Sequence, residues 1–268
     1  MKNNDWRQKM LDDLTSILKN MNGFVSLSVF GSMANNSTLD IWSDIDALLV
    51  VKDESINDYF PQSDWLEKIG KIFTIQQSSN DRSNTFKIIY DDFRKIDLII
   101  TKESKVLEGD PFWAKQNVLF SNSDLVTKRL SVSNENNTRF DEKSYHLDKL
   151  SDEFWFMAYT ALTKIMRDDL LIGFHLTLDL YKMCLVLAMW IRDRETGTNI
   201  HRIGGIKNEL IEELNIKVDD FSKKGFIMLI DKCSKEYDTL ASRWSDNYIS
   251  RLKRFEFLIN TALEKIKQ

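Results

Sequence analysis

Hydrophobic positions along the first hundred residues change between helical and strand periods. Apolar side chains recur at intervals of three and four over residues 5–21, which predicts an amphipathic helix. Residues 24–30 alternate as a short strand. Residues 45–51 are apolar except for Asp46, a pattern typical of a central strand buried on both faces. Further elements are expected at residues 63–69 (a short helix), and at 73–77, 86–90 and 96–101 (three strands).

The second half of the chain shows helical periods only. Residues 131–144 are rich in Ser and Asn and are the best candidate for a linker. Beyond it, helices are expected over 149–168, 170–195, 205–214, 220–235 and 236–266, with breaks at Gly197 and Gly204-Gly205. We therefore expect an α+β fold, with a mixed-sheet domain over residues 1–135, an all-α helical domain over residues 145–268, and a cleft between them.

Composition and charge narrow the classes of protein. Of the 268 residues, 43% are hydrophobic and 29% are charged, a balance that excludes a disordered chain. The net charge is −4, so the composition gives no indication of a basic face for binding nucleic acid. Cys184 and Cys233 are too few for a disulfide framework. The N-terminus lacks an apolar signal core, and the run Leu180–Ile191 is too short to span a bilayer. We expect a cytoplasmic protein that binds no membrane.

Three short motifs carry candidate chemistry. Gly31-Ser32 follows a strand directly and opens a turn whose backbone N–H groups can face a phosphate. Asp44 and Asp46 are two residues apart, so their carboxylates leave the same face of a strand. Asp97 begins an apolar strand, where a carboxylate is costly unless it is paired or bound to metal. Three carboxylates of this kind form a site for two Mg²⁺ ions.

In this order, the motifs resemble the nucleotidyltransferase superfamily. Longer stretches resemble more closely the aminoglycoside 6-adenylyltransferases that modify streptomycin, from about residue 10 to residue 200. These stretches are Asp64-Trp65-Leu66, Phe73-Thr74-Ile75-Gln76-Gln77, Tyr90-Asp91-Asp92-Phe93-Arg94-Lys95-Ile96-Asp97-Leu98 and Asp152-Glu153-Phe154-Trp155. The resemblance implies a nucleotidyltransferase-type sheet and transfer of AMP from Mg-ATP to an aminoglycoside hydroxyl, with release of pyrophosphate.

The resemblance also implies roles for the motif residues. Asp44 and Asp46 would hold Mg²⁺ against the triphosphate, and the Gly31-Ser32 turn would bind its β- and γ-phosphates. Asp97 would be either a third metal ligand or the general base that takes the proton of the acceptor, and both roles stay open. ATP is then the co-substrate.

A polar stripe on the first long helix of the second half is a further candidate. Its members are Glu153, Met157, Thr160, Lys164 and Arg167, whereas Phe154, Ala158, Ala161, Leu162 and Ile165 form a separate apolar face that we expect in the core. Given the resemblance, Lys164 and Arg167 would reach the triphosphate, and Glu153 and Asp152 would bind a cationic acceptor. Without it, such a stripe is more often a solvated, salt-bridged face.

Other functions remain open at this point. The acceptor of a nucleotidyltransferase could be another small drug, such as a lincosamide. A transferase acting on RNA is disfavoured by the acidic balance. A non-catalytic regulator with the same fold is disfavoured because a binding module gains nothing from three clustered carboxylates. The partners we expect are ATP and a small cationic drug, with no nucleic acid, and the protein is expected to be a monomer or homodimer.

Overall fold

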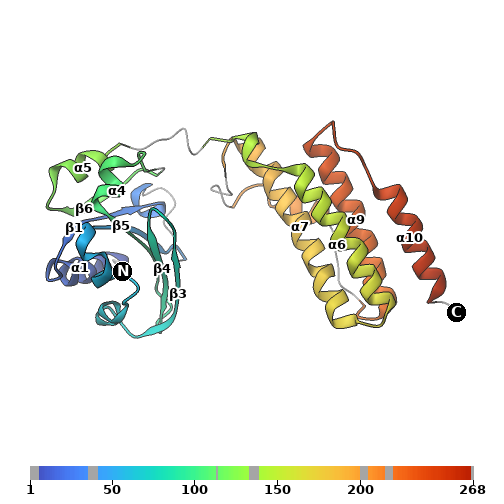
Figure 1. The fold of residues 1–268 in the computed structure, drawn as a ribbon, viewed down its shortest axis with the longest axis horizontal. Helices are drawn as coiled ribbons and strands as arrows, with labels where there is room; N and C mark the ends of the chain where they lie inside the picture. The colour runs from blue at the N-terminus through green and yellow to red at the C-terminus, as the bar shows by residue number, and fades with distance from the viewer. Residues whose placement is uncertain are drawn as a thin grey trace, which may run out of the picture. The chain divides into compact units, whose positions relative to one another are not determined.

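The computed structural model describes residues 6–35, 42–112, 114–132, 139–199, 205–214 and 220–266. The chain divides into two compact units, Met1–Asn137 and Thr138–Gln268 (Figure 1). Within the described residues, the strands that form the sheet belong to the first unit, and the second unit is built from helices. The expected α+β class, with a mixed sheet followed by helices, is therefore confirmed. Residues 133–138 of the expected linker lie outside the described residues.

The first unit is organised around one mixed sheet with the strand order β3-β4-β5-β2-β1-β6. Its strands are β1 (Phe24–Phe30), β2 (Ile45–Val51), β3 (Ile72–Ser79), β4 (Asn84–Tyr90), β5 (Lys95–Lys102) and β6 (Asn117–Ser121). β2 and β5 run parallel, and the other neighbouring pairs run antiparallel. The expected strands are all present. β6 was not predicted, because its apolar residues Val118, Leu119 and Phe120 are consecutive and show neither an alternation nor a longer apolar run.

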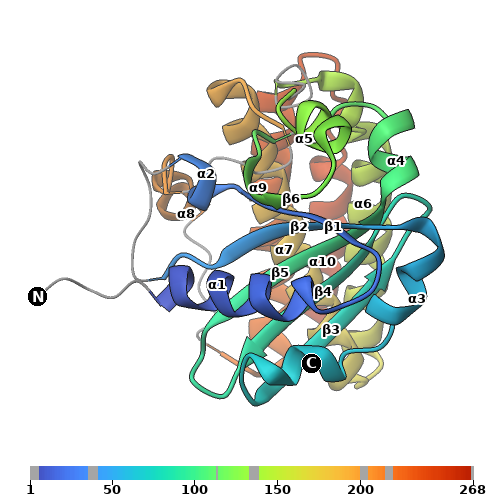
Figure 2. The same cartoon turned by 90° about the vertical axis from the view of Figure 1, so that its left-hand side faces the viewer.

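Helices cover both faces of this sheet. α1 (Trp6–Lys19) buries Met10, Leu14 and Leu18 in the core cluster that also contains the Ala47 side of β2. Figure 2 shows α1 lying across the strands. The other face carries a smaller core, formed by Val25, Phe30, Leu48, Val50, Val126 and Leu130, under α4 (Glu103–Glu108) and α5 (Asp124–Leu130). The strands are therefore buried on both sides along part of their length, as the apolar run over 45–51 predicts.

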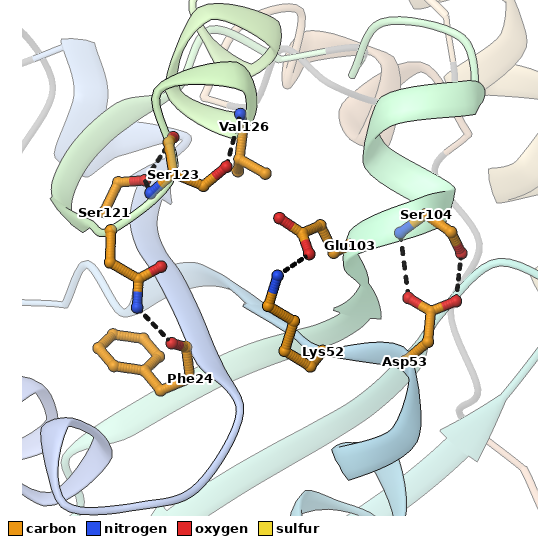
Figure 3. A network of polar contacts seen from close by, with 9 residues as sticks. Phe24, Lys52, Asp53, Glu103, Ser104, Ser121, Ser123 and Val126 are labelled. Carbon is orange, nitrogen blue, oxygen red and sulfur yellow. Dashed lines mark hydrogen bonds and ion pairs between the residues drawn. The ribbon is translucent and has the colours of Figure 1, made fainter.

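Polar contacts hold α4 to the end of β2. The backbone N–H and the hydroxyl of Ser104 donate to the two carboxylate oxygens of Asp53, at 3.1 and 2.5 Å (Figure 3). Lys52 pairs with Glu103 beside them at 2.5 Å. Short helices of this unit were not expected from the sequence, namely α2 (Ser32–Asn35), α3 (Ile56–Tyr59), α4, α5 and the 3₁₀ turn η1 (Asp53–Ser55). The helix expected over 63–69 is a 3₁₀ helix, η2 (Asp64–Lys68).

The second unit contains η4 (Glu142–Ser144), α6 (Leu147–Met166), α7 (Leu170–Thr196), α8 (Glu209–Leu214), α9 (Lys223–Trp244) and α10 (Leu252–Lys265). α6, α7 and α9 share one core, in which Phe154 stacks on Tyr237 with ring centroids 3.8 Å apart. The apolar face predicted for α6, from Phe154 to Ile165, is buried. Cys184 and Cys233 are buried free thiols.

The predicted helices of this unit shift by a few residues at several ends, and the largest difference concerns the boundary near residue 235. The expected break between residues 235 and 236 is wrong, because α9 continues to Trp244. Its apolar positions Tyr237, Leu240 and Ala241 keep the same helical period and stay in the core. The chain breaks instead over residues 245–251, before α10.

α7 also passes the test of length and composition for a membrane-spanning helix, over Leu170–Thr196. The sequence analysis considered only the shorter run inside it. In this structure Leu180, Leu187 and Ile191 of α7 are buried in the core shared with α6 and α9. Core helices of globular proteins pass the same test. The helix ends at Gly197, which has a left-handed backbone with φ of 70°, so the predicted break there is confirmed.

Candidate active site

The three predicted carboxylates meet on one face of the sheet in the first unit. Asp46 of β2 lies opposite Asp97 of β5, and Asp44 precedes β2 by one residue. Because side chains two residues apart on a strand share a face, Asp44 and Asp46 point the same way. One carboxylate oxygen from each of the three lies within 4.8 Å of those from the other two. The sequence spacing therefore identified groups that the sheet register brings together.

Two lysines contact this carboxylate cluster. Lys95 Nζ contacts Asp44 Oδ2 and lies 3.1 Å from Asp97 Oδ1. Lys87 of β4 lies opposite Asp97 in the sheet, and its Nζ is 3.8 Å from Asp97 Oδ2. Neither lysine was predicted from the sequence as a member of the site. The position of Lys95 could have been predicted from the sequence, because it precedes Asp97 by two residues on one strand and must share its face. The position of Lys87 beside Asp97 follows only from the register of the β4–β5 pair.

The electrostatics of the cluster favour an added cation. Burial and the neighbouring charges of Asp44 and Asp97 raise the pKa of Asp46 to about 6, although Lys95 and Lys87 oppose the shift. Asp97 Oδ1 is buried and accepts no hydrogen bond from any described residue, even though Lys95 Nζ lies nearby. Carboxylate oxygens that converge without sufficient counter-charge are the donor set that Mg²⁺ binds, so these residues fit a divalent cation.

The Gly31-Ser32 turn lies directly against the cluster. Gly31 has φ of +63°, a conformation that favours glycine, and a β-carbon at this position would stand 2.5 Å from Asp46 Oδ2. Phe30, the preceding residue, is opposite Asp46 in the β1–β2 register. Ser32 then begins α2. The turn predicted to face phosphate is therefore adjacent to the carboxylates predicted to hold metal.

A buried arginine fixes the chain just before Asp44. Arg7 of α1 donates from Nε and Nη2 to the carbonyl oxygen of Ser43, at 2.8 and 2.6 Å. Arg7 is only 6% exposed, so these charge-assisted hydrogen bonds hold the backbone firmly. Trp42, on the other side of Ser43, is 86% exposed. No sequence pattern indicated the role of Arg7, because its partner is a backbone atom 36 residues away.

A cavity of about 560 Å³ lies on the same sheet face, further along β2 and β5. Leu48, Ile99 and Thr101 contribute to its lining, each an even number of residues from Asp46 or Asp97. Arg129 also lines it and donates to the carbonyl oxygens of Val106 and Gly109. None of the predicted site residues lines this cavity.

The candidate residues on α6 belong to the second unit. Glu153 is exposed, while Asp152 pairs with Arg251, the residue before α10, at 2.6 Å. Lys164 pairs with Asp169 at 3.2 Å, and Arg167 is exposed at the C-terminal end of α6. Of the four, Asp152, Glu153 and Arg167 are exposed and Lys164 is half-buried, and the roles of all four remain predictions.

Comparisons with known proteins bear on the identity of the chain. An aminoglycoside 6-adenyltransferase from Bacillus subtilis is a structural neighbour with 15% identity and a TM-score of 0.38, covering 96% of this chain and 98% of that one. A nucleotidyltransferase-like protein from Exiguobacterium sibiricum has 9% identity and a TM-score of 0.34, covering 89% and 78%. A search of curated protein sequences found no match.

The family of the chain follows from its sequence. A family model described as streptomycin adenylyltransferase matches residues 5–201, which include β1, β2, β5, α6 and α7. The matched segment therefore contains all of the predicted site residues, in both units of the chain. With this match, the chain belongs to the streptomycin adenylyltransferase family of nucleotidyl-transferring enzymes.

Proposed function

We propose that this protein transfers AMP from Mg-ATP to a hydroxyl group of a streptomycin-like aminoglycoside and releases pyrophosphate. The observation that carries the proposal is the convergence of Asp44, Asp46 and Asp97 within 4.8 Å, beside the Gly31 turn. Family membership supplies the reaction class. Modification of the drug would confer resistance on a cell in which the enzyme is cytoplasmic.

Each residue of the cluster has a part in this reaction. Asp44 and Asp46 would hold Mg²⁺, which supplies charge neutralisation at the triphosphate when it is bound. The backbone N–H groups of the Gly31-Ser32 turn would hold the β- and γ-phosphates, so that the α-phosphorus faces the acceptor hydroxyl in line. The leaving pyrophosphate would remain on that turn until release.

Asp97 has two possible roles in the proposal. It is the third carboxylate of the cluster, and among the described residues its buried Oδ1 atom accepts no hydrogen bond and has the Lys95 ammonium 3.1 Å away, so it can serve as a metal ligand. The same oxygen is equally available as a general base for the proton of the acceptor hydroxyl. Substitution by Asn abolishes either role, whereas only the ligand role predicts weaker Mg²⁺ binding without substrates.

For the acceptor, we propose that Glu153 contacts a cationic group of the drug. Asp152 is the weaker candidate because Arg251 already neutralises it. Lys164 and Arg167 would contribute positive charge to the triphosphate. The contact between Lys164 and Asp169 is half exposed, so it costs little to exchange for a phosphate oxygen.

Pyrophosphate release from Mg-ATP tests the proposal. The full chain is assayed with streptomycin first, then with kanamycin-type drugs, spectinomycin, a lincosamide and an RNA oligonucleotide. We expect release that depends on an aminoglycoside. Release with the lincosamide or the oligonucleotide alone would instead support the corresponding alternative acceptor.

A further inference from the structure

The ammonium group of a lysine side chain lies within the carboxylate cluster. Lys95 Nζ contacts Asp44 Oδ2 and lies 3.1 Å from Asp97 Oδ1, so one ammonium group bridges two of the three carboxylates. Asp44 and Asp97 are contributed by different segments, the residue before β2 and the strand β5. The ammonium therefore contacts Asp44, which the proposed function assigns to metal, and Asp97, which it treats as either a third metal ligand or the general base.

The side chain of Lys95 is also free to move its ammonium group away from this position. Its backbone is fixed in β5, opposite Ile89 of β4, while its side chain is 40% exposed and carries four flexible methylenes. A residue anchored in a strand and half exposed at its tip can move its ammonium without disturbing the sheet. The hydrogen bond from Lys95 to Asp44 and its ion pair with Asp97 lie in a partly solvated site, where such contacts are worth little individually, so their exchange is feasible.

We propose that Lys95 is a tethered counter-ion that occupies the cation position between Asp44 and Asp97 and is displaced when a divalent ion binds there. This inference rests on the proposed function, since it takes the cluster as the metal site. An ammonium and Mg²⁺ compete for the same carboxylate oxygens, and the divalent ion wins by its higher charge and closer approach. The displaced ammonium remains beside the cluster, where it faces the phosphates of an incoming nucleotide.

Lys87 provides the contrast that makes the inference specific. Its Nζ is 3.8 Å from Asp97 Oδ2 and contacts only that carboxylate among the three, and its side chain is 54% exposed. Lys87 therefore lies at the edge of the cluster rather than between its members. Both lysines contribute one positive charge nearby, so a difference between them reports position and not net charge.

Calorimetric titration with Mg²⁺ alone, without nucleotide, tests this inference on the full chain. Lys95→Met is compared with the parent protein and with Lys87→Met as the matched control. Because Mg²⁺ no longer has an ammonium to displace, we expect Lys95→Met to bind Mg²⁺ about three- to tenfold more tightly than the parent. Lys87→Met should change the affinity less than Lys95→Met does, because its ammonium does not bridge the carboxylates.

Thermal unfolding supplies a second readout. Without metal, Lys95→Met should unfold at a lower temperature than the parent, because three carboxylates then face one another without their bridging cation. Saturating Mg²⁺ should narrow this difference. If Lys95→Met does not fold without metal, Lys95→Gln retains hydrogen-bonding capacity without the charge and is used for the same two measurements.

The outcomes separate this inference from the function on which it rests. Mg²⁺ affinity that is unchanged or lower in Lys95→Met, with normal binding by the parent, contradicts the role of Lys95 alone. An equal gain in Lys87→Met also contradicts it, since the effect would then be one of net charge. If no Mg²⁺ binds to the parent or to the variants, the metal site itself is wrong and both proposals fail.

Discussion

Gly31 and Asp46 are so close that a β-carbon on Gly31 would stand 2.5 Å from the Oδ2 atom of the Asp46 carboxylate. The turn after β1 and the beginning of β2 are therefore fitted to each other at the point where the proposed phosphate and metal sites join. Gly31 satisfies two requirements at once, because its φ of +63° disfavours any side chain and its missing side chain leaves room for a carboxylate.

Gly31→Ala should therefore displace Asp46 and reduce transfer strongly while the fold is kept. The matched control is Gly197→Ala, whose φ is +70° but whose added β-carbon would meet no atom within 4 Å. Both variants should lose about 1 kcal/mol of stability from the left-handed backbone. Only Gly31→Ala should also lose Mg²⁺ affinity, measured by calorimetry. Equal Mg²⁺ affinity in the two variants would show that the close approach to Asp46 has no functional consequence.

Asp46 should give the metal-free protein a distinct pH dependence. Its pKa in the folded chain is about 6, above the ordinary value of 3.8, so the folded state holds this proton more tightly than the unfolded state. The stability contribution of Asp46 should therefore fall as the pH rises from about 4 to about 6, and then remain constant. Asp46→Asn should remove this decline and unfold at a higher temperature than the parent at pH 7, while transfer is nearly abolished.

Melting curves in the presence of a chelator, between pH 4 and pH 8, check this prediction. Asp44→Asn is the control, because Asp44 contacts Lys95 and its loss should not stabilise the protein in the same way. Parent and Asp46→Asn curves that run parallel across this range would mean that Asp46 is not under electrostatic strain.

Ser32→Ala tests the phosphate turn. If the turn binds the β- and γ-phosphates, loss of the hydroxyl should raise KM for ATP by about five- to tenfold, the usual cost of one hydrogen bond, and leave KM for the acceptor nearly unchanged. Steady-state kinetics with each substrate varied in turn separates the two constants. A change in KM for the acceptor alone would show that the turn contacts the acceptor and not the phosphates of ATP.

Glu153→Gln tests the proposed acceptor contact. Removing one charge-assisted contact should weaken binding of a cationic drug by about ten- to a hundredfold, and ATP binding should change little. The decline of drug affinity with ionic strength should also become shallower than in the parent, because a screened charge pair has been lost. Calorimetry at several salt concentrations measures both effects.

Lys164→Ala is the comparison variant for this experiment, because it should affect the other substrate. It should impair the use of ATP and leave drug binding intact. If Glu153→Gln binds every cationic drug as tightly as the parent, the exposed face of α6 is a solvated surface and the acceptor binds elsewhere.

The sequence predicted the sheet well where its strands are long and strongly apolar. β1 and β2 begin and end at the expected residues, because the alternation of β1 and the apolar run of β2, broken only by Asp46, stand between polar segments. β6, α4 and α5 are short, and their apolar positions are too few to establish a period. The end of α9 was misplaced because the charged residues Lys235, Glu236 and Asp238 lie outside the core side of a continuous helix.

In the candidate site too, residues that are close along the chain were predicted, and residues that only the fold brings together were not. Asp44, Asp46 and Gly31 were recognisable because their spacing along the chain is short and typical of one kind of chemistry. Lys87 approaches Asp97 only through the register of β4 against β5. Arg7 binds a backbone carbonyl, which has no sequence signature at all. Contacts of these two kinds depend on tertiary structure and were not predictable.

Mass spectrometry of streptomycin after incubation with Mg-ATP and the full chain tests the central claim most directly. The account predicts a product heavier by one AMP group, formed by the parent protein and absent with Asp46→Asn, although that variant is folded. Unmodified streptomycin and other aminoglycosides after incubation with the folded parent protein would contradict the account. Product formed at the parental rate by Asp46→Asn would contradict it equally, because the chemistry would then not depend on the carboxylate cluster.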